Sequence, residues 1–296
     1  MKRRDFVNQL AVVGGLTAAG FSQMACSTPN TFKMGLQLYT VRDAMEQDPI
    51  TTLTKLKALG YQHFETYGFD AQSEMLYGFK TKEFKQVLND LGLTTTSGHF
   101  GFMNYFDASQ DQLSWFVDQC IKASKTLEAS YLTWPLVNPE KRNAESFKIL
   151  ADKLNFIGER VKAGGLGFAY HNHGYEFENW EGTTGHEILM QRTDADLVKL
   201  QMDMYWVVRS GKTPKELVDQ QPKRYTMWHI KDMDKVTQDY SELGNGSIDY
   251  TQILPDAEAS GLEYYYLEQG GNFEVNSMES VATSARFFKK NIQHLI

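Results

Sequence analysis

The stretch LGFAYHNHGYEF, residues 166–177, begins with an apolar run that leads to two histidines, His171 and His173. Three later stretches repeat this arrangement: VKLQMDMYW (198–206), YTMWHIKDM (225–233) and YYYLEQG (264–270). Each short apolar run is typical of a buried β-strand, and each leads to a side chain that can bind a metal. These side chains are His171, Asp203, His229 and Glu268. Because such residues are rarely buried unless they are paired or bound to a metal, the four runs predict one convergent site.

The same alternation of strand-like and helix-like segments runs through the whole chain. Earlier strand-like runs cover 33–41, 63–68, 94–100 and 131–137. Between the runs, apolar residues recur at spacings of three and four, and several segments close on glycine, as helices do. These helical segments cover 50–60, 81–92, 109–127, 145–165 and 277–292, with weaker patterns over 184–192, 214–220 and 250–260. Eight strands that alternate with eight helices predict an α/β fold, a closed (β/α)8 TIM barrel, as one domain over residues 33–296.

An open, doubly wound sheet is the structural alternative. Such a sheet usually carries a glycine-rich phosphate loop after its first strand. The segment LQLYTVRD (36–43) contains no glycine at that point. We therefore favour the barrel, in which active sites lie at the carboxyl ends of the strands.

The first 26 residues have the composition of an export signal. Arg3 and Arg4 precede the apolar and small-residue stretch 10–21, and the pair resembles a twin-arginine signal, which exports folded proteins. Ala25 and Cys26 resemble the end of a lipoprotein signal, in which the cysteine would be lipidated. We therefore expect an exported protein, either periplasmic or anchored to the membrane through Cys26. A structural N-terminal helix is the alternative, and the glycines of the apolar stretch count against it.

Composition excludes several classes of partner. Residues 1–26 carry three basic residues and one acidic residue, so the 30 Lys and Arg and 37 Asp and Glu of the chain become 27 and 36, a net charge of −9. This balance argues against nucleic acid and against anionic lipid as partners. No later apolar run reaches the length of a membrane span. Only Cys120 remains besides Cys26, so no intramolecular disulfide framework is expected. Composition does not decide the oligomeric state.

In a barrel, the four candidate metal ligands come from strands five to eight. Four neighbouring strand ends can surround one ion without any loop doing the positioning. Two imidazoles and two carboxylates suit Mn²⁺, Zn²⁺, Co²⁺ or Fe²⁺ better than Ca²⁺ or Mg²⁺. The expected cofactor is therefore one divalent ion of the first group. The alternative is a polar network without a metal.

Six segments together resemble a known family: LQLYTVRD, AYHNHGYEF, QMDMYWV, WHIKDMD, LGNGSIDY and YLEQGG. They are similar to the xylose isomerase-like barrels often called sugar phosphate isomerases/epimerases, from about residue 33 to the end of the chain. The resemblance implies a divalent metal held on strands five to eight by His171, Asp203, His229 and Glu268. The family includes ketose epimerases, inosose dehydratase and enzymes that cleave 3-keto-glycosides. Most of them remove a proton next to a carbonyl group while the metal stabilises the enediolate.

One departure from the family pattern affects the expected reaction. The ketose epimerases use glutamates on strands five and eight as a paired acid and base, whereas the strand-five position here is His171. This departure favours a lyase or dehydratase reaction over an epimerisation. A phosphorylated substrate is not expected, because no glycine-rich loop leads into a helix after strands seven or eight and only nine arginines are present.

Four residues are candidates for the catalytic chemistry. His173 shares a strand face with the histidine two residues before it, and a neutral imidazole suits removal of a proton near pH 7. Glu268 would serve as the opposing acid, as in the related epimerases. Lys231 would orient a hydroxyl group or polarise a carbonyl group, with a buried ion pair to Asp203 or Glu268 as the alternative. Glu176 is a further candidate base.

Substrate contacts are expected from polar and aromatic residues at the strand ends. Sugars bind through hydrogen bonds at their edges and through aromatic contact with their C–H faces. The candidates are Gln37, Tyr39, Glu65, His99, Trp134 and Trp206. The alternative is ordinary packing for each aromatic residue, and a salt bridge at the barrel rim for Glu65.

The sequence favours a divalent-metal-dependent isomerase or epimerase that acts on a sugar or keto-sugar. The first alternative is a lyase or dehydratase that cleaves a 3-keto-glycoside or dehydrates a keto-polyol at the same site. A periplasmic sugar-binding protein on the same barrel is the non-enzymatic alternative. A metal-dependent endonuclease of the same barrel type would need a basic groove, which the negative charge opposes.

Overall fold

A computed structural model describes residues 32–296 of the chain. The expected export signal, residues 1–26 with Cys26, lies outside the described residues. Within 32–296, none of the helices combines the length and the apolar character needed to cross a membrane.

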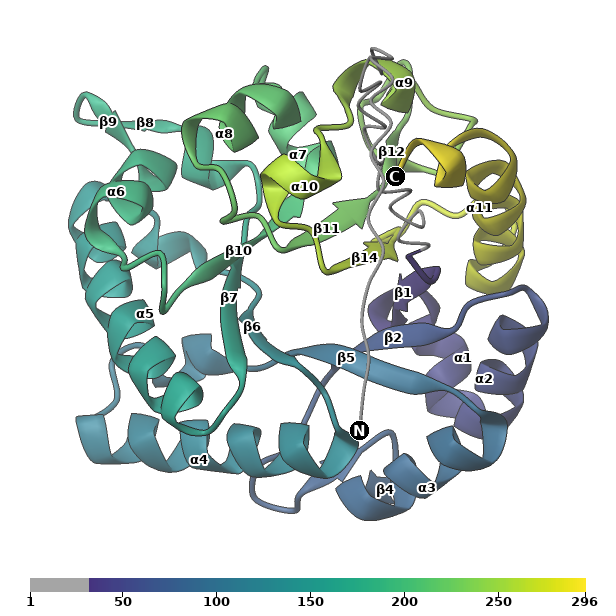
Figure 1. The fold of residues 1–296 in the computed structure, drawn as a ribbon, viewed down its shortest axis with the longest axis horizontal. Coiled ribbons are helices and arrows are strands. Elements are labelled where there is room, and N and C mark those ends of the chain that lie inside the picture. The colour runs from purple at the N-terminus through teal and green to yellow at the C-terminus, as the bar shows by residue number, and fades with distance from the viewer. Residues whose placement is uncertain (1–31) are drawn as a thin grey trace, which may run out of the picture. The chain divides into compact units, whose positions relative to one another are not determined.

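Parallel strands close into one barrel in the described part of the chain (Figure 1). The eight strands are β1 (Gly35–Gln37), β2 (His63–Tyr67), β5 (Thr94–His99), β6 (Tyr131–Trp134), β7 (Gly167–His171), β10 (Lys199–Asp203), β11 (Met227–Ile230) and β14 (Tyr264–Leu267). Neighbours in the ring follow the order of the chain, and β1 closes the ring by pairing with both β2 and β14. The predicted TIM barrel is confirmed.

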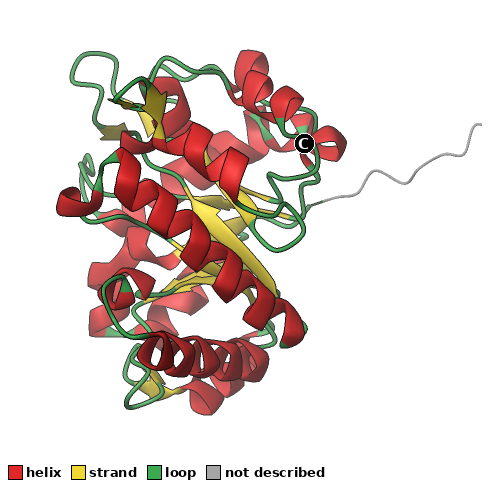
Figure 2. Ribbon diagram, turned by 90° about the vertical axis from the view of Figure 1, so that its left-hand side faces the viewer, coloured by secondary structure: helices red, strands yellow, loops and turns green. Residues whose placement is uncertain are grey.

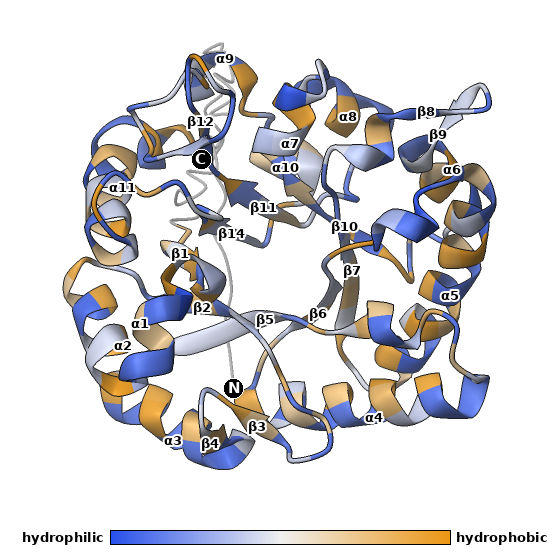
Figure 3. Ribbon diagram, turned by 180° about the vertical axis from the view of Figure 1, so that it is seen from behind, coloured by the Kyte–Doolittle hydropathy of each residue, from blue (hydrophilic) through white to orange (hydrophobic). Residues whose placement is uncertain are grey.

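Helices surround the barrel (Figure 2). The longer ones are α2 (Pro49–Ala58), α3 (Thr81–Leu91), α4 (Gln110–Leu127), α5 (Ala144–Ala163), α6 (Gly185–Arg192) and α11 (Ser277–Asn291). Helix α4 shows why they form: Ser109 and Gln112 make a reciprocal capping box at its start, and one face buries Leu113, Phe116 and Val117. Hydrophobic and hydrophilic residues accordingly alternate along the outer helices (Figure 3).

The shorter helices differ more from the sequence prediction. They are α1 (Arg42–Gln47), α7 (Met204–Arg209), α8 (Pro214–Gln220), α9 (Tyr250–Ile253) and α10 (Ala257–Ser260). The sequence predicted one helix over 250–260, but the chain forms two, because Pro255 disfavours a helical conformation at Leu254. Helices α1 and α7 were not predicted.

The strand expected over 198–206 ends earlier than its apolar pattern suggests. Asp203 is both the last residue of β10 and the N-cap of α7, where its carboxylate accepts a hydrogen bond from the backbone N–H of Trp206. An aspartate satisfies the free N–H groups at a helix start well. Trp206 therefore belongs to a helix rather than to the strand, because a short apolar run alone does not distinguish the two.

Polar side chains fill the inside of the barrel, where TIM barrels usually carry branched apolar residues. Each of these side chains is fully buried: Gln37, Glu65, Ser97, Thr133, Gln201 and Tyr266. Alternate residues of the same strands face the helices and form the apolar core, among them Leu36, Phe64, Leu132, Phe168, Met202 and Trp228. The barrel axis is therefore a hydrogen-bonded polar column, and the apolar packing lies between strands and helices.

Three small hairpins extend the connections of the barrel. They are β3 (Met75–Leu76) with β4 (Phe79–Lys80), β8 (Asn179–Trp180) with β9 (Thr183–Thr184), and β12 (Asp232–Met233) with β13 (Tyr240–Ser241). The buried Asp232 carboxylate accepts hydrogen bonds from the backbone N–H groups of Gly244, Gly246 and Ile248. A Cβ atom on Gly246 would lie 2.1 Å from Oδ1 of Asp232, so only glycine fits there. This carboxylate shapes the loop that follows β13.

Candidate active site

Four predicted metal ligands converge at the carboxyl ends of the barrel strands. His171 and Asp203 are the last residues of β7 and β10, His229 lies in β11, and Glu268 directly follows β14. One donor atom from each residue lies within 4.8 Å of the donor atoms of the other three. Three of the side chains are buried, and Glu268 is partly exposed. The sequence thus predicted correctly that these four residues lie together.

Two donor atoms of this cluster face each other without a hydrogen-bond partner. Nε2 of His171 and Oδ2 of Asp203 are buried and lie 3.3 Å apart. A buried polar atom without a partner is unfavourable. A divalent cation would satisfy both atoms, because each can offer it a lone pair. The residues present therefore fit a metal ion.

The ammonium group of Lys231 lies beside the same carboxylates. Its Nζ atom is 2.7 Å from Oδ2 of Asp203 and 2.8 Å from Oε2 of Glu268. The contact with Asp203 is an ion pair without hydrogen-bond geometry. Burial lowers the pKa of Lys231, but Asp203 and Glu268 outweigh burial and raise the pKa above its ordinary value. The buried ion pair that was the alternative to a catalytic role of Lys231 is present, and the amine is charged.

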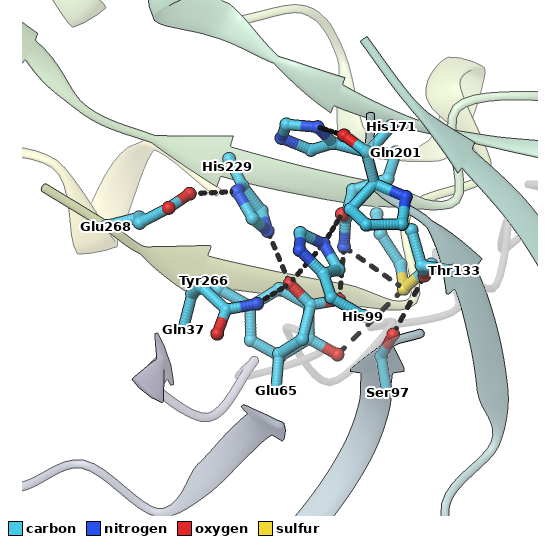
Figure 4. Close-up of polar contacts among 12 residues, drawn as sticks. Gln37, Glu65, Ser97, His99, Thr133, His171, Gln201, His229, Tyr266 and Glu268 are labelled. Atoms are coloured by element: carbon cyan, nitrogen blue, oxygen red, sulfur yellow. Dashed lines mark hydrogen bonds and ion pairs between the residues drawn. The ribbon is translucent and has the colours of Figure 1, made fainter. Parts of the chain in front are cut away.

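His229 bridges two carboxylates (Figure 4). Its Nδ1 atom lies 2.5 Å from Oε2 of Glu268, and its Nε2 atom lies 2.6 Å from Oε2 of Glu65. Burial lowers the pKa of His229, but Glu268 and Glu65 together raise it to about 9. Nδ1 faces the other ligands, and Nε2 is held from behind. A carboxylate behind a metal-binding histidine fixes the orientation of the ring.

Glu65 is the hub of the polar column beneath the ligands. Oε2 accepts hydrogen bonds from Gln37 over 2.7 Å and from His229, and lies 3.0 Å from Nε2 of His99. Its other oxygen accepts one from Gln201 over 2.7 Å. Burial raises the pKa of Glu65, but His99 and His229 lower it to well below its ordinary value. The carboxylate is therefore ionised and fully satisfied.

The buried charges do not balance. Lys231 holds the pKa of Asp203 at about 2 against the effect of burial, and Lys231 and His229 hold the pKa of Glu268 well below its ordinary value. Together with Glu65 these are three buried carboxylates around the ammonium group of Lys231. His229 can bind a metal only after its Nδ1 atom has lost its proton, and the three carboxylates then exceed the positive charge of Lys231, which favours a cation.

His173 lies beyond the end of β7, and its ring centroid is 4.9 Å from that of His171. Its backbone N–H donates to Oε2 of Glu176 over 2.8 Å, and its Nδ1 atom lies 3.3 Å from the hydroxyl oxygen of Tyr175. Burial, together with His171 and Lys231, holds the pKa of His173 well below its ordinary value. The imidazole is therefore neutral at pH 7.

Glu176 lies fully buried behind His173. It accepts hydrogen bonds from the Tyr170 hydroxyl over 2.5 Å and from the backbone of His173. Burial raises the pKa of Glu176 to about 7. Because it is absent from the walls of the cleft described next, it holds the backbone of His173 and does not reach a substrate.

The ligand cluster opens into a cleft of about 600 Å³. His173, Lys231 and Glu268 line it, together with Tyr39 and His99, two of the residues predicted to contact a substrate. Further aromatic side chains in its walls are Tyr67, Phe69, Phe100 and Tyr240. A cleft of this size with a few polar groups among aromatic rings can enclose a small polar molecule.

Other residues that were expected at the mouth lie elsewhere. Gln37 and Glu65 are fully buried beneath the ligands. Trp134 is also fully buried, because its position in β6 faces the helices: it stacks on Phe102 at 5.5 Å, and its indole N–H donates to the Leu136 carbonyl. Trp206 lines a neighbouring cleft that also includes His173.

Sequence reasoning missed two residues that support the site. Gln201 donates to Glu65 and lies with its amide oxygen 2.7 Å from Nε2 of His99. Its position two residues before Asp203, on the same strand face, was a usable signal. Asn172 accepts a hydrogen bond from the backbone N–H of Asp203 over 3.0 Å, and only its place between two histidines marks it in the sequence.

Comparison with known proteins agrees with this architecture. A family model described as "Xylose isomerase-like TIM barrel" matches residues 53–291. A solved structure described as a sugar phosphate isomerase/epimerase from Parabacteroides distasonis has a TM-score of 0.78 and 26% identity, over 90% of this chain and 96% of that one. The IOLI protein with a bound zinc atom has a TM-score of 0.69 and 14% identity, over 90% of this chain and 99% of that one, which is a likeness of fold alone.

Curated relatives match a shorter part of the chain. Inosose dehydratase from Clostridium beijerinckii is 28% identical over 142 residues, and inosose dehydratase from Clostridium perfringens is 31% identical over 147 residues. Each match covers 42% of this chain and 47% of the relative. The chain therefore spans about half the length of the curated relatives it matches.

Proposed function

The chain belongs to the xylose isomerase-like TIM barrel family, and on that premise we propose that it is a divalent-metal-dependent enzyme acting on a sugar or keto-sugar. The proposed reaction is an isomerisation or epimerisation that begins with removal of a proton next to a carbonyl group. The observation that carries the proposal is the buried His171 Nε2 atom without a hydrogen-bond partner, 3.3 Å from Asp203 Oδ2, inside a four-donor cluster at the base of an open cleft. The descriptions of the relatives, isomerases/epimerases and a dehydratase of carbohydrates, support the substrate class.

The proposed ligands are His171, Asp203, His229 and Glu268. Bound there, a divalent ion would polarise a carbonyl oxygen and make the neighbouring C–H group more acidic. The protein's own part is to hold these four donors in place, chiefly through Glu65 behind His229 and Asn172 behind Asp203.

We propose His173 as the base. The role requires the tautomer with its proton on Nδ1, which donates to the Tyr175 oxygen and leaves the Nε2 lone pair free for a substrate proton. The same Tyr175 oxygen also accepts the backbone N–H of Val137 over 2.7 Å, so its position is fixed. A neutral imidazole at pH 7 is the form that a base requires.

Lys231 and Glu268 would complete the proton transfers. Lys231 is charged and lines the cleft, so it would donate a hydrogen bond to an oxygen of the substrate. Glu268 is ionised, so it would need to take a proton from the adjacent Lys231 ammonium, 2.8 Å away, before it could deliver one to the opposite face of the substrate. Epimerisation would use His173 and Glu268 from the two sides of the cleft.

Elimination is the second candidate. The same first step leads to a lyase or dehydratase reaction when a leaving group lies next to the carbanion. The observation in its favour is His171 at the end of β7, where the ketose epimerases carry a catalytic glutamate, since Glu176 lies too deep to replace that glutamate. The inosose dehydratase relatives point the same way.

Metal analysis combined with solvent exchange tests the proposal. The purified protein would be loaded with Mn²⁺ or Zn²⁺, dialysed and analysed for bound metal, and then incubated in D₂O with a panel of keto-sugars and 3-keto-glycosides. We expect one ion per chain and an exchange of the substrate α-proton that a chelator abolishes. Retention of no ion would reject the metal site. Binding of a sugar without any exchange or turnover would instead identify a sugar-binding protein.

A further inference from the structure

A second cleft, of about 660 Å³, lies next to the one that contains the ligand cluster. His173 lines both clefts, so the two adjoin at this residue. We call the second the arginine cleft, because Arg142 and Arg209 line it together with Tyr175 and Trp206. Its volume lies within the range of small-molecule sites, roughly 300–1,000 Å³.

Aromatic and guanidinium groups lie side by side along the walls of the arginine cleft, with His173 at the centre. On one side, His173 stacks on Tyr175 with centroids 5.2 Å apart and planes at 10°, and the Arg142 guanidinium lies 3.9 Å from the Tyr175 centroid. On the other side, the Trp206 ring lies 5.6 Å from His173, and the Arg209 guanidinium lies 5.2 Å from Trp206. Cation–π contacts of this kind hold a guanidinium in place without neutralising its charge.

Neither guanidinium has an acidic partner. Arg142 donates through Nε to the Val137 carbonyl over 3.0 Å, and Arg209 donates through one terminal nitrogen to the Tyr205 hydroxyl over 3.0 Å. Within residues 32–296 no carboxylate lies within ion-pair distance of either guanidinium. Two carboxylates lie nearby: Glu178 lines the cleft and is exposed, and the buried Glu176 interacts electrostatically with Arg142 without forming an ion pair.

Two other exposed arginines are paired with carboxylates. Arg160 contacts Asp118 through two nitrogens, over 2.7 and 2.6 Å, and Arg192 contacts both oxygens of Asp152. Among the residues described, Arg286 also has no carboxylate partner, so what distinguishes Arg142 and Arg209 is that both line the same cleft. They form a positive site on a predominantly negative protein.

We propose that the arginine cleft is a second subsite, which binds an anionic group, a carboxylate or a phosphate, carried by the carbohydrate on the far side of His173 from the metal ligands. This inference rests on the proposed function, in which the sugar ring that reacts lies in the cleft beside the metal ligands. The planar guanidinium group presents paired donors that match the oxygens of a carboxylate or phosphate. Trp206 supplies aromatic surface for a second ring that carries the anion, whereas the Tyr175 ring is covered by His173 and Arg142. The substrate is accordingly longer than a single neutral monosaccharide.

Calorimetric binding to the purified full-length protein tests the subsite without any turnover. The probes are methyl β-D-glucuronide, its neutral counterpart methyl β-D-glucoside, glucose 6-phosphate and inorganic phosphate, each at low and high salt. We expect at least one anionic sugar to bind tenfold or more tightly than the glucoside, and salt to reduce the difference. Comparison of the glucuronide with the phosphate ester identifies which anion the cleft prefers.

Substitutions locate the effect. Arg142→Gln and Arg209→Gln should each remove most of the anion preference, about tenfold, and the double variant should abolish it. Arg286→Gln is the matched control, because Arg286 lies on α11, away from both clefts, and contacts only Thr283. Thermal unfolding of each variant checks that the fold is retained.

Each result separates the subsite from the proposed function. Equal affinity for glucuronide, phosphate ester and glucoside would overturn the subsite and leave the carbohydrate function standing. A loss in Arg286→Gln as large as in Arg142→Gln would also overturn it, since the effect would then be one of net charge. Arginine-dependent binding of inorganic phosphate without binding of any sugar derivative would support the anion site and reject the carbohydrate function. Failure to bind any of the four probes would overturn the subsite.

Discussion

Nζ of Lys231 lies 2.7 Å from Oδ2 of Asp203, so a lysine ammonium already compensates a carboxylate that the proposed metal would also need. Glu268 is shared in the same way, with Nζ of Lys231 2.8 Å from its Oε2 atom. The ammonium and a divalent ion therefore draw on the same two carboxylates. This competition makes Lys231 the residue that sets how tightly an ion is held.

Replacing Lys231 with methionine should have opposite effects with and without metal. The metal-free protein should lose roughly 3–5 kcal/mol of unfolding free energy, because Asp203 becomes a buried charge without its partner. Metal affinity should rise about tenfold, because a competing positive charge is gone. Urea unfolding with and without Zn²⁺, and chelator competition, measure the two effects. Lys199→Met, outside the cluster, is the control, and a fall in metal affinity of Lys231→Met would contradict the competition.

Glu65→Gln should lower the affinity of the site for a metal although none of the four proposed ligands is replaced. The amide cannot hold the N–H of His229 as an ionised carboxylate does, so the affinity for Zn²⁺ should fall by about 10- to 100-fold. Chelator competition measures the change. Ser97→Ala is the matched control, since Ser97 belongs to the same polar column and contacts Thr133. An unchanged affinity in Glu65→Gln would show that the ring needs no anchor.

His173→Gln should keep the metal and lose most turnover. Loss of a general base typically costs about 10²–10⁴-fold in rate. Exchange of the substrate α-proton in D₂O should disappear in parallel. His186→Gln serves as the control, because this histidine lies on α6 and contacts Tyr225. Exchange at the wild-type rate in His173→Gln would move the base to Glu268 or Lys231.

Glu176→Gln should change how stability depends on pH. Burial raises the pKa of Glu176 from 4.5 to about 7, so the folded protein favours the protonated acid. The stability that this contributes is fully present below about pH 4.5 and is lost as the pH rises through about 7. Glutamine cannot ionise. The free energy of unfolding of the variant, relative to that of the wild type, should therefore rise by about 3 kcal/mol between pH 4 and pH 8. Urea unfolding of the metal-free proteins across this range measures the gain, and parallel curves would contradict it.

Export is the fifth prediction and concerns the segment before the barrel. Replacing Arg3 and Arg4 with lysines should leave the full-length protein in the cytoplasm, because twin-arginine transport recognises the arginine pair. Cell fractionation measures the distribution. Normal export of the variant would remove the support for a twin-arginine signal.

The barrel and the convergence of the four proposed ligands could be predicted from the sequence because both follow from local patterns repeated along the chain. Each apolar run ends in its own ligand, and the parallel topology brings the ends together. The end of β10 could not be placed, because Tyr205 and Trp206 are as apolar as the strand residues before them. What decided the boundary is the N-cap hydrogen bond of Asp203, which exists only in the folded chain.

Roles that depend on contacts between distant residues could not be predicted. Glu65 was expected at the rim, but its register beside Gln37 and its contact with His229 place it at the base of the site. Arg142 and Arg209 carry no pattern in the sequence, and only the stacking on Tyr175 and Trp206 brings them into one cleft. The role of a side chain that depends on a neighbour distant in the sequence cannot be predicted from a local sequence pattern.

The pairing of β1 with β14 also governs when the site can exist during protein synthesis. Glu65 lies near the start of the barrel and Glu268 near its end, and His229 touches both. A nascent chain that has not yet emerged as far as β14 holds three of the four donors around an open ring. The four proposed donors can therefore come together only after Glu268 has been synthesised, and a chain shortened before Tyr264 should lose the ring closure and the fourth donor together.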